Sequence, residues 1–289
     1  MAKGSKRPAA VSGLAVKRGL RDSSAETCGR HAIVTTKSQQ AFPIKPGRRP
    51  GQACDSRESM AKLPDPRLWW VPSLRSRMRA DWNRRAHENA FHYVSTGKRD
   101  WTAEEFFESG RQTVREHVLN DLGNICRGKA PGQMRVLEIG CGVGRVTRAL
   151  AEVFGDVHGV DVSDEMVRLA RAYLHSIPNA KVYRNSGSDL KVLGDLAFDF
   201  AFSNLVFQHI PSRGVIENYV REVGARLSQG ALFKFQVIGR PGRWWHRDTW
   251  FGAPFTERDA AAMAERCGFE ARHMHGAGTQ DFWLWFFKQ

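Results

Sequence analysis

Apolar residues occur at helical spacing in two segments of the chain before residue 123. In residues 79–94 they recur every three or four positions, which predicts an amphipathic helix. A second helix is predicted from Thr102 to Leu122, because Thr102 and Glu105 have the spacing of a capping box and apolar residues follow at helical spacing.

From residue 135 onward, short apolar runs typical of strands alternate with longer stretches of helical spacing. The predicted strands are 135–139, 157–161, 181–185, 198–203 and 231–237, and the predicted helices are 144–153, 163–175, 213–227 and 257–267. Such alternation predicts a parallel sheet covered by helices on both faces. The last two strand-like runs, 269–274 and 281–287, have no crossover helix between them, so we expect them to pair antiparallel.

Residues 1–66 differ in composition from the rest of the chain. They are rich in Lys, Arg, Ser, Gly and Pro and hold few large apolar residues, so they cannot bury enough surface to offset the entropy of ordering. We expect a disordered basic tail here, N-terminal helices within residues 67–130 and a core domain over residues 131–289. Two other interpretations of the tail stay open: an organelle targeting segment, or residues upstream of a natural start at Met60 or Met78.

The net charge of +14 is concentrated near the start of the chain. Residues 1–77 carry a net charge of +11 and residues 78–289 a net charge of +3, so the charge is only a weak sign of a nucleic-acid partner. The five cysteines include no C-x-x-C pair, which predicts neither a disulfide framework nor a metal site and favours a reducing, cytoplasmic compartment. No apolar run is long enough to predict a membrane-spanning helix, and no secretory signal is expected.

The segment Glu138-Ile139-Gly140-Cys141-Gly142-Val143-Gly144 carries the strongest chemical signal. A predicted buried strand ends here in a turn with three glycines, and a helix is predicted to follow. Glycine permits positive φ and a close approach of a ligand to the backbone, and the free N–H groups of a helix N-terminus attract anionic groups. The next strand ends at Asp161, 17 residues after Gly144, where a carboxylate can accept hydrogen bonds from both hydroxyls of a ribose.

The spacing of the glycines distinguishes two cofactor families. The dinucleotide fingerprint G-x-G-x-x-G would need a third glycine at position 145, which is Arg145. Glycines at 140, 142 and 144, with an acid two positions before the first, resemble instead the class I S-adenosylmethionine-dependent methyltransferases, of the bacterial small-molecule type with a methyltransferase domain 11 or 12. The resemblance implies S-adenosylmethionine as cofactor and a doubly wound, Rossmann-like α/β sheet of seven strands with the last strand antiparallel. An NAD-type oxidoreductase is the less favoured alternative.

The resemblance also implies roles for individual residues. Glu138 would reach the methionine ammonium group, Asp161 would hold the ribose and Asn204 would pass beneath the reactive sulfonium. The other implied cofactor-binding residues are Gly140, Cys141, Gly142, Gly144, Val162, Met166, Ser188 and Asp189. Structural alternatives stay open for some of them: Glu138 as a cap of the turn, Met166 as helix core, and Ser188 with Asp189 as a simple turn.

Methyl transfer is an in-line displacement at a carbon that a cationic sulfur already activates, so the protein has mainly to align the reactants and exclude water. A base is needed only when the acceptor holds its proton at neutral pH. His209 is the candidate base, and packing or helix capping is its alternative role. Acceptor recognition is expected from Tyr93 and from an aromatic, basic loop that contains Arg243, Trp244 and Trp245.

We therefore expect methyl transfer to an O or N atom of a small-molecule acceptor, or of a glycan or lipid intermediate. Two alternatives stay open. One is an RNA or protein methyltransferase whose basic tail helps to bind the substrate. The other is a non-catalytic relative that binds S-adenosylmethionine without turnover.

Overall fold

The computed structural model describes residues 71–240 and 249–289. The chain divides into two units, Met1–Ser59 and Met60–Gln289, and every described residue belongs to the second. The predicted basic tail of residues 1–66 and the predicted acceptor residues Arg243, Trp244 and Trp245 lie outside the described residues.

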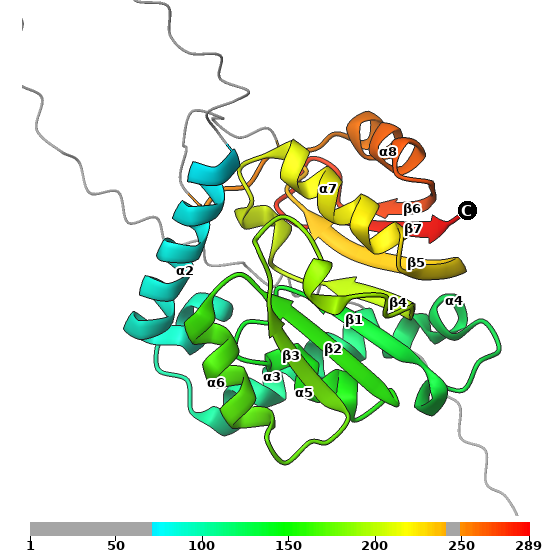
Figure 1. Ribbon diagram of the computed structural model, residues 1–289. Helices are drawn as coiled ribbons and strands as arrows, with labels where there is room; N and C mark the ends of the chain where they lie inside the picture. Colours follow the sequence, from blue (N-terminus) through cyan, green and yellow to red (C-terminus); the bar gives the residue numbers. More distant parts are fainter. Residues whose placement is uncertain (1–70, 241–248) are drawn as a thin grey trace, which may run out of the picture. The chain divides into compact units, whose positions relative to one another are not determined.

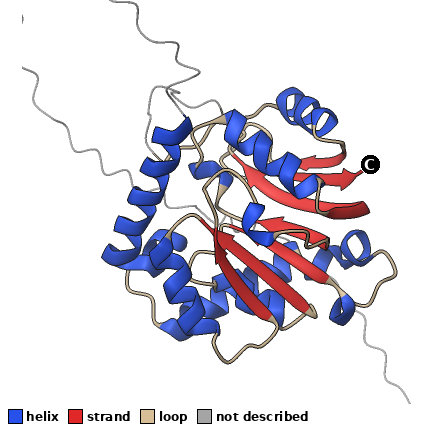
Figure 2. Cartoon of the chain, viewed as in Figure 1, coloured by secondary structure: helices blue, strands red, loops and turns tan. Residues whose placement is uncertain are grey.

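Among the described residues, seven strands form one sheet in the order β3-β2-β1-β4-β5-β7-β6 (Figures 1 and 2). The strands are β1 (Arg135–Ile139), β2 (Asp156–Asp161), β3 (Ala180–Arg184), β4 (Phe198–Ser203), β5 (Leu227–Val237), β6 (Phe269–His275) and β7 (Phe282–Lys288). β1 pairs in parallel with β2 and β4, and β7 is antiparallel to both β5 and β6. The strand order reverses between β1 and β4, which is where doubly wound sheets bind ligands. The predicted fold class, with its antiparallel last strand, is confirmed.

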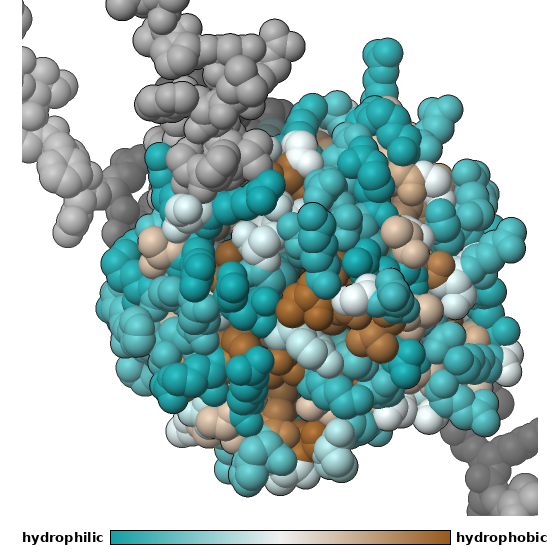
Figure 3. Space-filling model, viewed as in Figure 1, coloured by the Kyte–Doolittle hydropathy of each residue, from teal (hydrophilic) through white to brown (hydrophobic). Residues whose placement is uncertain are grey.

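Helices cover both faces of this sheet, because successive residues of a strand point to opposite faces. Val136 of β1 shares a core cluster with residues of α3, α4 and α5, whereas its neighbour Leu137 shares one with residues of α7 and α8. The bounds of the helices are α3 (Ala103–His117), α4 (Leu122–Cys126), α5 (Arg145–Ala151), α6 (Asp164–Leu174), α7 (Arg213–Gly224) and α8 (Glu257–Arg266). Hydrophilic residues cover most of the face shown in Figure 3. No helix in the described ranges is both long and apolar enough to cross a membrane.

α2 (Val71–Val94) lies at the carboxyl ends of the central strands rather than in either helical layer (Figure 1). Its helical geometry is interrupted at Asn89 (φ −167°, ψ 86°), whose Oδ1 accepts a hydrogen bond from the backbone N–H of His92. This internal cap starts a last turn with a new direction, and that turn brings Val94 against Gly142. The helix begins at Val71, earlier than the predicted residue 79.

The second predicted helix is confirmed at its start and wrong at its end. Thr102 and Glu105 form the capping box, but α3 ends at His117, before a short turn and α4. The buried ammonium of Lys234 on β5 explains the break. It donates to the His117 carbonyl at 2.7 Å and to the Asp121 carboxylate at 2.8 Å. The His117 carbonyl is therefore lost to the helical pattern, and the chain turns toward the sheet.

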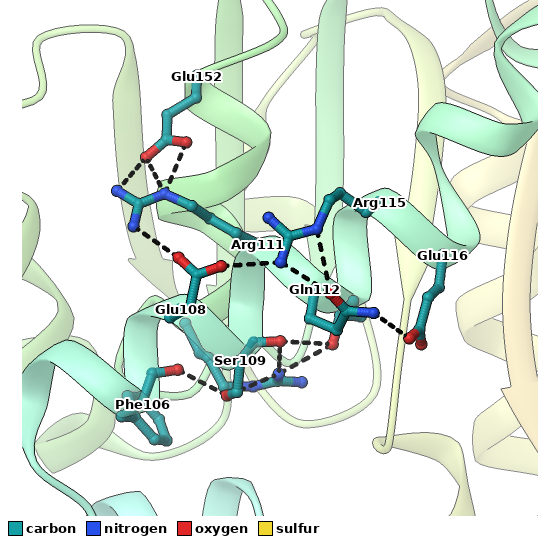
Figure 4. A network of polar contacts seen from close by, with 10 residues as sticks. Phe106, Glu108, Ser109, Arg111, Gln112, Arg115, Glu116 and Glu152 are labelled. Carbon is teal, nitrogen blue, oxygen red and sulfur yellow. Dashed lines mark hydrogen bonds and ion pairs between the residues drawn. The ribbon is translucent and has the colours of Figure 1, made fainter.

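α3 packs closely against the start of α5 (Figure 4). Arg111 of α3 forms ion pairs with Glu108 at 3.1 Å and with Glu152, just after α5, at 2.8 Å. Gly110 makes the approach possible, because a Cβ at this position would overlap the backbone carbonyl of Arg145. This contact fixes the first residue of α5 against α3.

Gly110→Ala is expected to lower the free energy of unfolding by about 1–3 kcal/mol, the usual cost of overpacking, although alanine is the better helix former. Gly123→Ala is the matched control, since Gly123 also lies in a helix but has no atom within 4 Å of a Cβ placed there. It should leave stability unchanged or raise it slightly. Urea unfolding measures both variants, and equal stabilisation by the two would contradict the close contact of α3 with α5.

Candidate active site

The turn between β1 and α5 is built on three glycines with positive φ. Gly140, Gly142 and Gly144 have φ values of 73°, 52° and 88°, a region that other residues rarely adopt. Gly140 and Gly142 also meet close neighbours: a Cβ on Gly140 would overlap Val206, and one on Gly142 would lie 2.7 Å from Val94. The glycines therefore let α2 and the turn after β4 close on the turn after β1.

Asp161, the last residue of β2, is tied to this turn. Its Oδ2 accepts a hydrogen bond from the backbone N–H of Gly142 at 2.9 Å, and its Oδ1 accepts one from Ser163 at 2.8 Å. Burial raises the pKa of Asp161, and the backbone hydrogen bonds partly offset that rise. A carboxylate offers about four acceptor positions, so Asp161 can still accept a hydrogen bond from a ligand.

Glu138 is a buried acid on β1, 4% exposed. Its Oε2 accepts a hydrogen bond from the Thr147 hydroxyl of α5 at 2.5 Å. Burial raises the pKa of Glu138 to about 7, against the opposing effects of Thr147 and of the charge on Arg145. No backbone N–H of the described residues donates to it, so its contacts differ from those of a cap of the turn.

A cavity of about 790 Å³, counting its open mouth, lies at the carboxyl ends of β1, β2 and β4. The predicted residues that line it are Tyr93, Glu138, Gly140, Cys141, Gly142, Asp161, Val162, Met166, Asn204 and His209. The predicted residues Gly144, Ser188 and Asp189 do not line it. The structure adds lining residues that sequence reasoning missed, among them Trp82, Arg145, Asn185 and Tyr219.

The comparisons with known proteins agree with this geometry. The family described as "Methyltransferase domain" matches residues 136–230, which include β1, the glycine turn and Asp161. Residues 136–230 are therefore similar to a methyltransferase domain. A crystal structure of magnesium protoporphyrin IX methyltransferase from Synechocystis PCC 6803 with bound S-adenosylmethionine has a similar fold, with a TM-score of 0.54 at 17% identity. The alignment covers 75% of this chain and 97% of that one.

Two curated relatives are similar in sequence over about half of this chain. Magnesium-protoporphyrin O-methyltransferase of Rhodobacter capsulatus is 29% identical over 151 residues, which cover 49% of this chain and 66% of the relative. Ubiquinone biosynthesis O-methyltransferase of Xanthomonas axonopodis pv. citri (strain 306) is 26% identical over 163 residues, 55% of this chain and 66% of the relative. The matched segments thus span just under two thirds of both relatives.

The site fits S-adenosylmethionine in its charges and acceptors. Glu138 and Asp161 both face the cavity, and neither has a cationic side chain within ion-pair distance among the described residues. Unpaired, largely buried carboxylates are costly unless a ligand supplies donors. An ammonium group and two ribose hydroxyls are donors of this kind.

On the side of β3 the cavity meets Asn185 and Tyr219 rather than Ser188 and Asp189. Asn185 follows β3 directly, and its Nδ2 donates to the Tyr219 hydroxyl at 2.8 Å. Asp189 accepts a hydrogen bond from the Ser186 hydroxyl at 2.8 Å, as in the simple-turn alternative. Asn185 could have been found from its place at the end of a strand, the same signal that singled out the acid of β2.

His209 has protein partners at both ring nitrogens. Its Nδ1 lies 2.8 Å from the Trp250 carbonyl oxygen, and its Nε2 lies 3.2 Å from Nε2 of Gln208. A carbonyl only accepts, so Nδ1 carries the proton and the Gln208 amide donates to Nε2. Gln236 supports this orientation, because it accepts from the Leu205 backbone at 3.1 Å and donates to Oε1 of Gln208 at 3.3 Å. Nδ1 of His209 is thus the donor to the Trp250 carbonyl, and its role as a base stays a prediction.

Aromatic side chains border the cavity beside the turn after β4. Trp82 of α2 meets the His209 ring edge-on with centroids 5.2 Å apart, and Tyr93 meets Trp250 edge-on at 5.8 Å. The Arg85 guanidinium lies 4.8 Å from the Trp82 ring and 5.0 Å from the Trp250 ring. α2 therefore contributes an aromatic wall to the site. Trp82 was missed because its helical spacing is also that of a core residue.

Asp161→Ala is expected to weaken the binding of S-adenosylhomocysteine, the demethylated cofactor, by more than about tenfold. The substitution leaves the ribose hydroxyls and the Gly142 N–H without their acceptor. Asp195→Ala is the control, because Asp195 is exposed and does not line the cavity. Calorimetric titration measures both variants. Unchanged affinity in Asp161→Ala would show that the ribose site is misplaced.

Glu138→Gln is expected to stabilise the cofactor-free protein at alkaline pH. Burial raises the pKa of Glu138 from 4.5 to about 7, so between these values the folded state binds more protons than the unfolded state. The Glu138 contribution to stability therefore falls as the pH rises through this window. At pH 8 the glutamine variant should exceed the wild type by up to about 3 kcal/mol in free energy of unfolding, and at pH 4 the two should agree.

Urea unfolding between pH 4 and pH 8 measures this difference. The same variant should bind S-adenosylhomocysteine about tenfold more weakly at pH 8, since the ammonium group loses its carboxylate. A variant that is less stable than the wild type at pH 8 would contradict the presence of a buried, unpaired carboxylate.

Proposed function

We propose that this protein is a methyltransferase that moves the methyl group of S-adenosylmethionine to an O or N atom of a small-molecule acceptor. The observation that carries the proposal is a pair of acids, Glu138 and Asp161, at the ends of neighbouring strands beside the glycine turn, with no cationic partner in the described ranges. The match of residues 136–230 to a methyltransferase domain supports the cofactor. The two curated relatives are named as O-methyltransferases, which supports oxygen as the atom methylated.

The protein contributes binding, orientation and the exclusion of water. The cofactor supplies a methyl group that its sulfonium already activates. Glu138 holds the ammonium group and Asp161 the ribose, so the cofactor is fixed at two separated points. Asn204, in the turn after β4, borders the same cavity as Trp82 and Tyr93. An acceptor that enters beside α2 therefore meets the cofactor in a largely apolar enclosure, where alignment accounts for most of the rate.

The aromatic wall suits a planar or largely apolar acceptor. The flat faces of Trp82 and Tyr93 gain contact area with such a molecule at little conformational cost. A hydroxyl acceptor has to lose a proton, and His209 can take it at Nε2 if the hydroxyl displaces the Gln208 amide. We keep His209 as the proposed base for this case. The three free cysteines of the described residues are compatible with the cytoplasmic location that we propose.

The experiment follows tritium from the labelled methyl group of S-adenosylmethionine into a cell extract separated into small molecules, protein and RNA. We expect enzyme-dependent label in the small-molecule fraction, and at least about tenfold less with the Asp161→Ala variant. Label in the protein or RNA fraction would contradict a small-molecule acceptor and would identify protein or RNA as the acceptor. Binding of S-adenosylhomocysteine without transfer to any fraction would support a non-catalytic relative.

A further inference from the structure

Arg145, the first residue of α5, is a buried cation that has no carboxylate partner among the described residues. It is 5% exposed and borders the cavity. Its Nη1 donates to the Ser109 carbonyl at 3.0 Å and to the Thr113 hydroxyl at 2.9 Å, and its Nη2 donates to Oδ1 of Asn204 at 3.1 Å. All of these acceptors are neutral; Ser109 is labelled on α3 in Figure 4. Its Nε has no acceptor among the described residues.

A buried guanidinium held only by neutral oxygens is costly, and an anion beside it would offset that cost. Glu138 borders the same cavity but does not form an ion pair with Arg145 within the described residues. Thr147 instead holds one oxygen of Glu138. The cavity thus carries separate positive and negative groups, an arrangement that suits a zwitterion better than it suits either group alone.

The hydrogen bond from Arg145 also fixes the direction of the Asn204 amide. Because Oδ1 of Asn204 accepts from Arg145, its other terminal atom is the donor Nδ2. No described residue accepts a hydrogen bond from this Nδ2, and Asn204 lines the cavity. A free amide donor and a guanidinium charge therefore lie next to each other, and both favour an anionic ligand group.

We propose that Arg145, together with the Asn204 amide that it orients, binds the carboxylate of the cofactor's amino-acid end, while Glu138 binds the ammonium group. The inference rests on the proposed function, because it assumes S-adenosylmethionine as the ligand. It assigns a binding role to a residue that the glycine motif does not include. It also explains why the two buried charges stay apart.

Calorimetric titration of the full chain with three ligands distinguishes the contributions of the cofactor's two charged groups to binding. S-adenosylhomocysteine carries both the ammonium and the carboxylate, its decarboxylated analogue carries only the ammonium, and 5′-methylthioadenosine carries neither. Arg145→Met is compared with Arg148→Met. The control removes the same charge from the same helix, where Arg148 lies over the Phe107 ring and outside the cavity lining.

Arg145→Met should weaken the binding of S-adenosylhomocysteine by about 10- to 100-fold, the range expected for the loss of a hydrogen bond to a charged group. The same variant should change the affinities for the decarboxylated analogue and for methylthioadenosine by less than about threefold. Arg148→Met should leave all three ligands within about twofold of the wild type. Glu138→Gln should weaken the binding of both ligands that carry the ammonium group. The two charges of the zwitterion would then be assigned to different residues.

An Arg145→Met variant that keeps the wild-type preference for S-adenosylhomocysteine over its decarboxylated analogue would overturn the proposal. In that case the anion that Arg145 meets would belong to the acceptor. Arg145 also joins α3 to α5, so a loss of methylthioadenosine binding would mean that the pocket itself has changed. In that case the variant Asn204→Leu tests the proposal, because it removes the amide donor and keeps the arginine. A wild-type chain that binds none of the three ligands would instead refute the proposed function.

Discussion

The hydrogen bonds between the glycine turn and the end of β2 hold the geometry on which the site depends. Gly140 and Cys141 donate to the Val160 carbonyl at 2.7 and 3.0 Å, and Gly142 donates to the Asp161 carboxylate at 2.9 Å. These bonds require the backbone to fold back with positive φ, which glycine permits. They fix the start of α5 beside the carboxyl end of β2, so the acid of β1, the acid of β2 and the first residue of α5 share one cavity.

Two further segments close on that turn from elsewhere in the sequence. Val94 at the end of α2 and Val206 in the turn after β4 both lie where a side chain on a turn glycine would be. The glycines thus act through packing between protein segments as well as through backbone freedom. Because α2 carries Trp82 and Tyr93, this closure also places the aromatic wall next to the cofactor end of the cavity. The proposed cofactor site and the proposed acceptor site are therefore joined through the contact of Val94 with Gly142.

Much of the fold follows from local patterns. β1 and β4 have the predicted bounds, and the other strands overlap their predictions, because alternation and glycine turns are encoded within short segments. The break after His117 was not predictable in this way, because it depends on Lys234, which is more than a hundred residues away in the sequence. The start of α2 was also placed too late. Local patterns set the elements, and distant contacts set where some of them end.

The residues of the candidate site were predictable to different degrees for the same reason. Glu138, Asp161 and the glycines follow from a contiguous motif and its spacing, and most of these residues line the cavity. Arg145 was visible in the motif only as a missing glycine, since its partners on α3 and after β4 are brought to it by the fold. Trp82 was hidden for a different reason: a residue that lines a cavity and one that fills a core have the same helical spacing.

The central claim is that the cavity beside the glycine turn binds the sulfur cofactor and not a dinucleotide. Calorimetric titration of the full chain with S-adenosylhomocysteine and, separately, with NAD tests this claim most directly. The account predicts saturable binding of S-adenosylhomocysteine with one site per chain and no detectable binding of NAD. Binding of NAD alone, or of neither ligand, would contradict it.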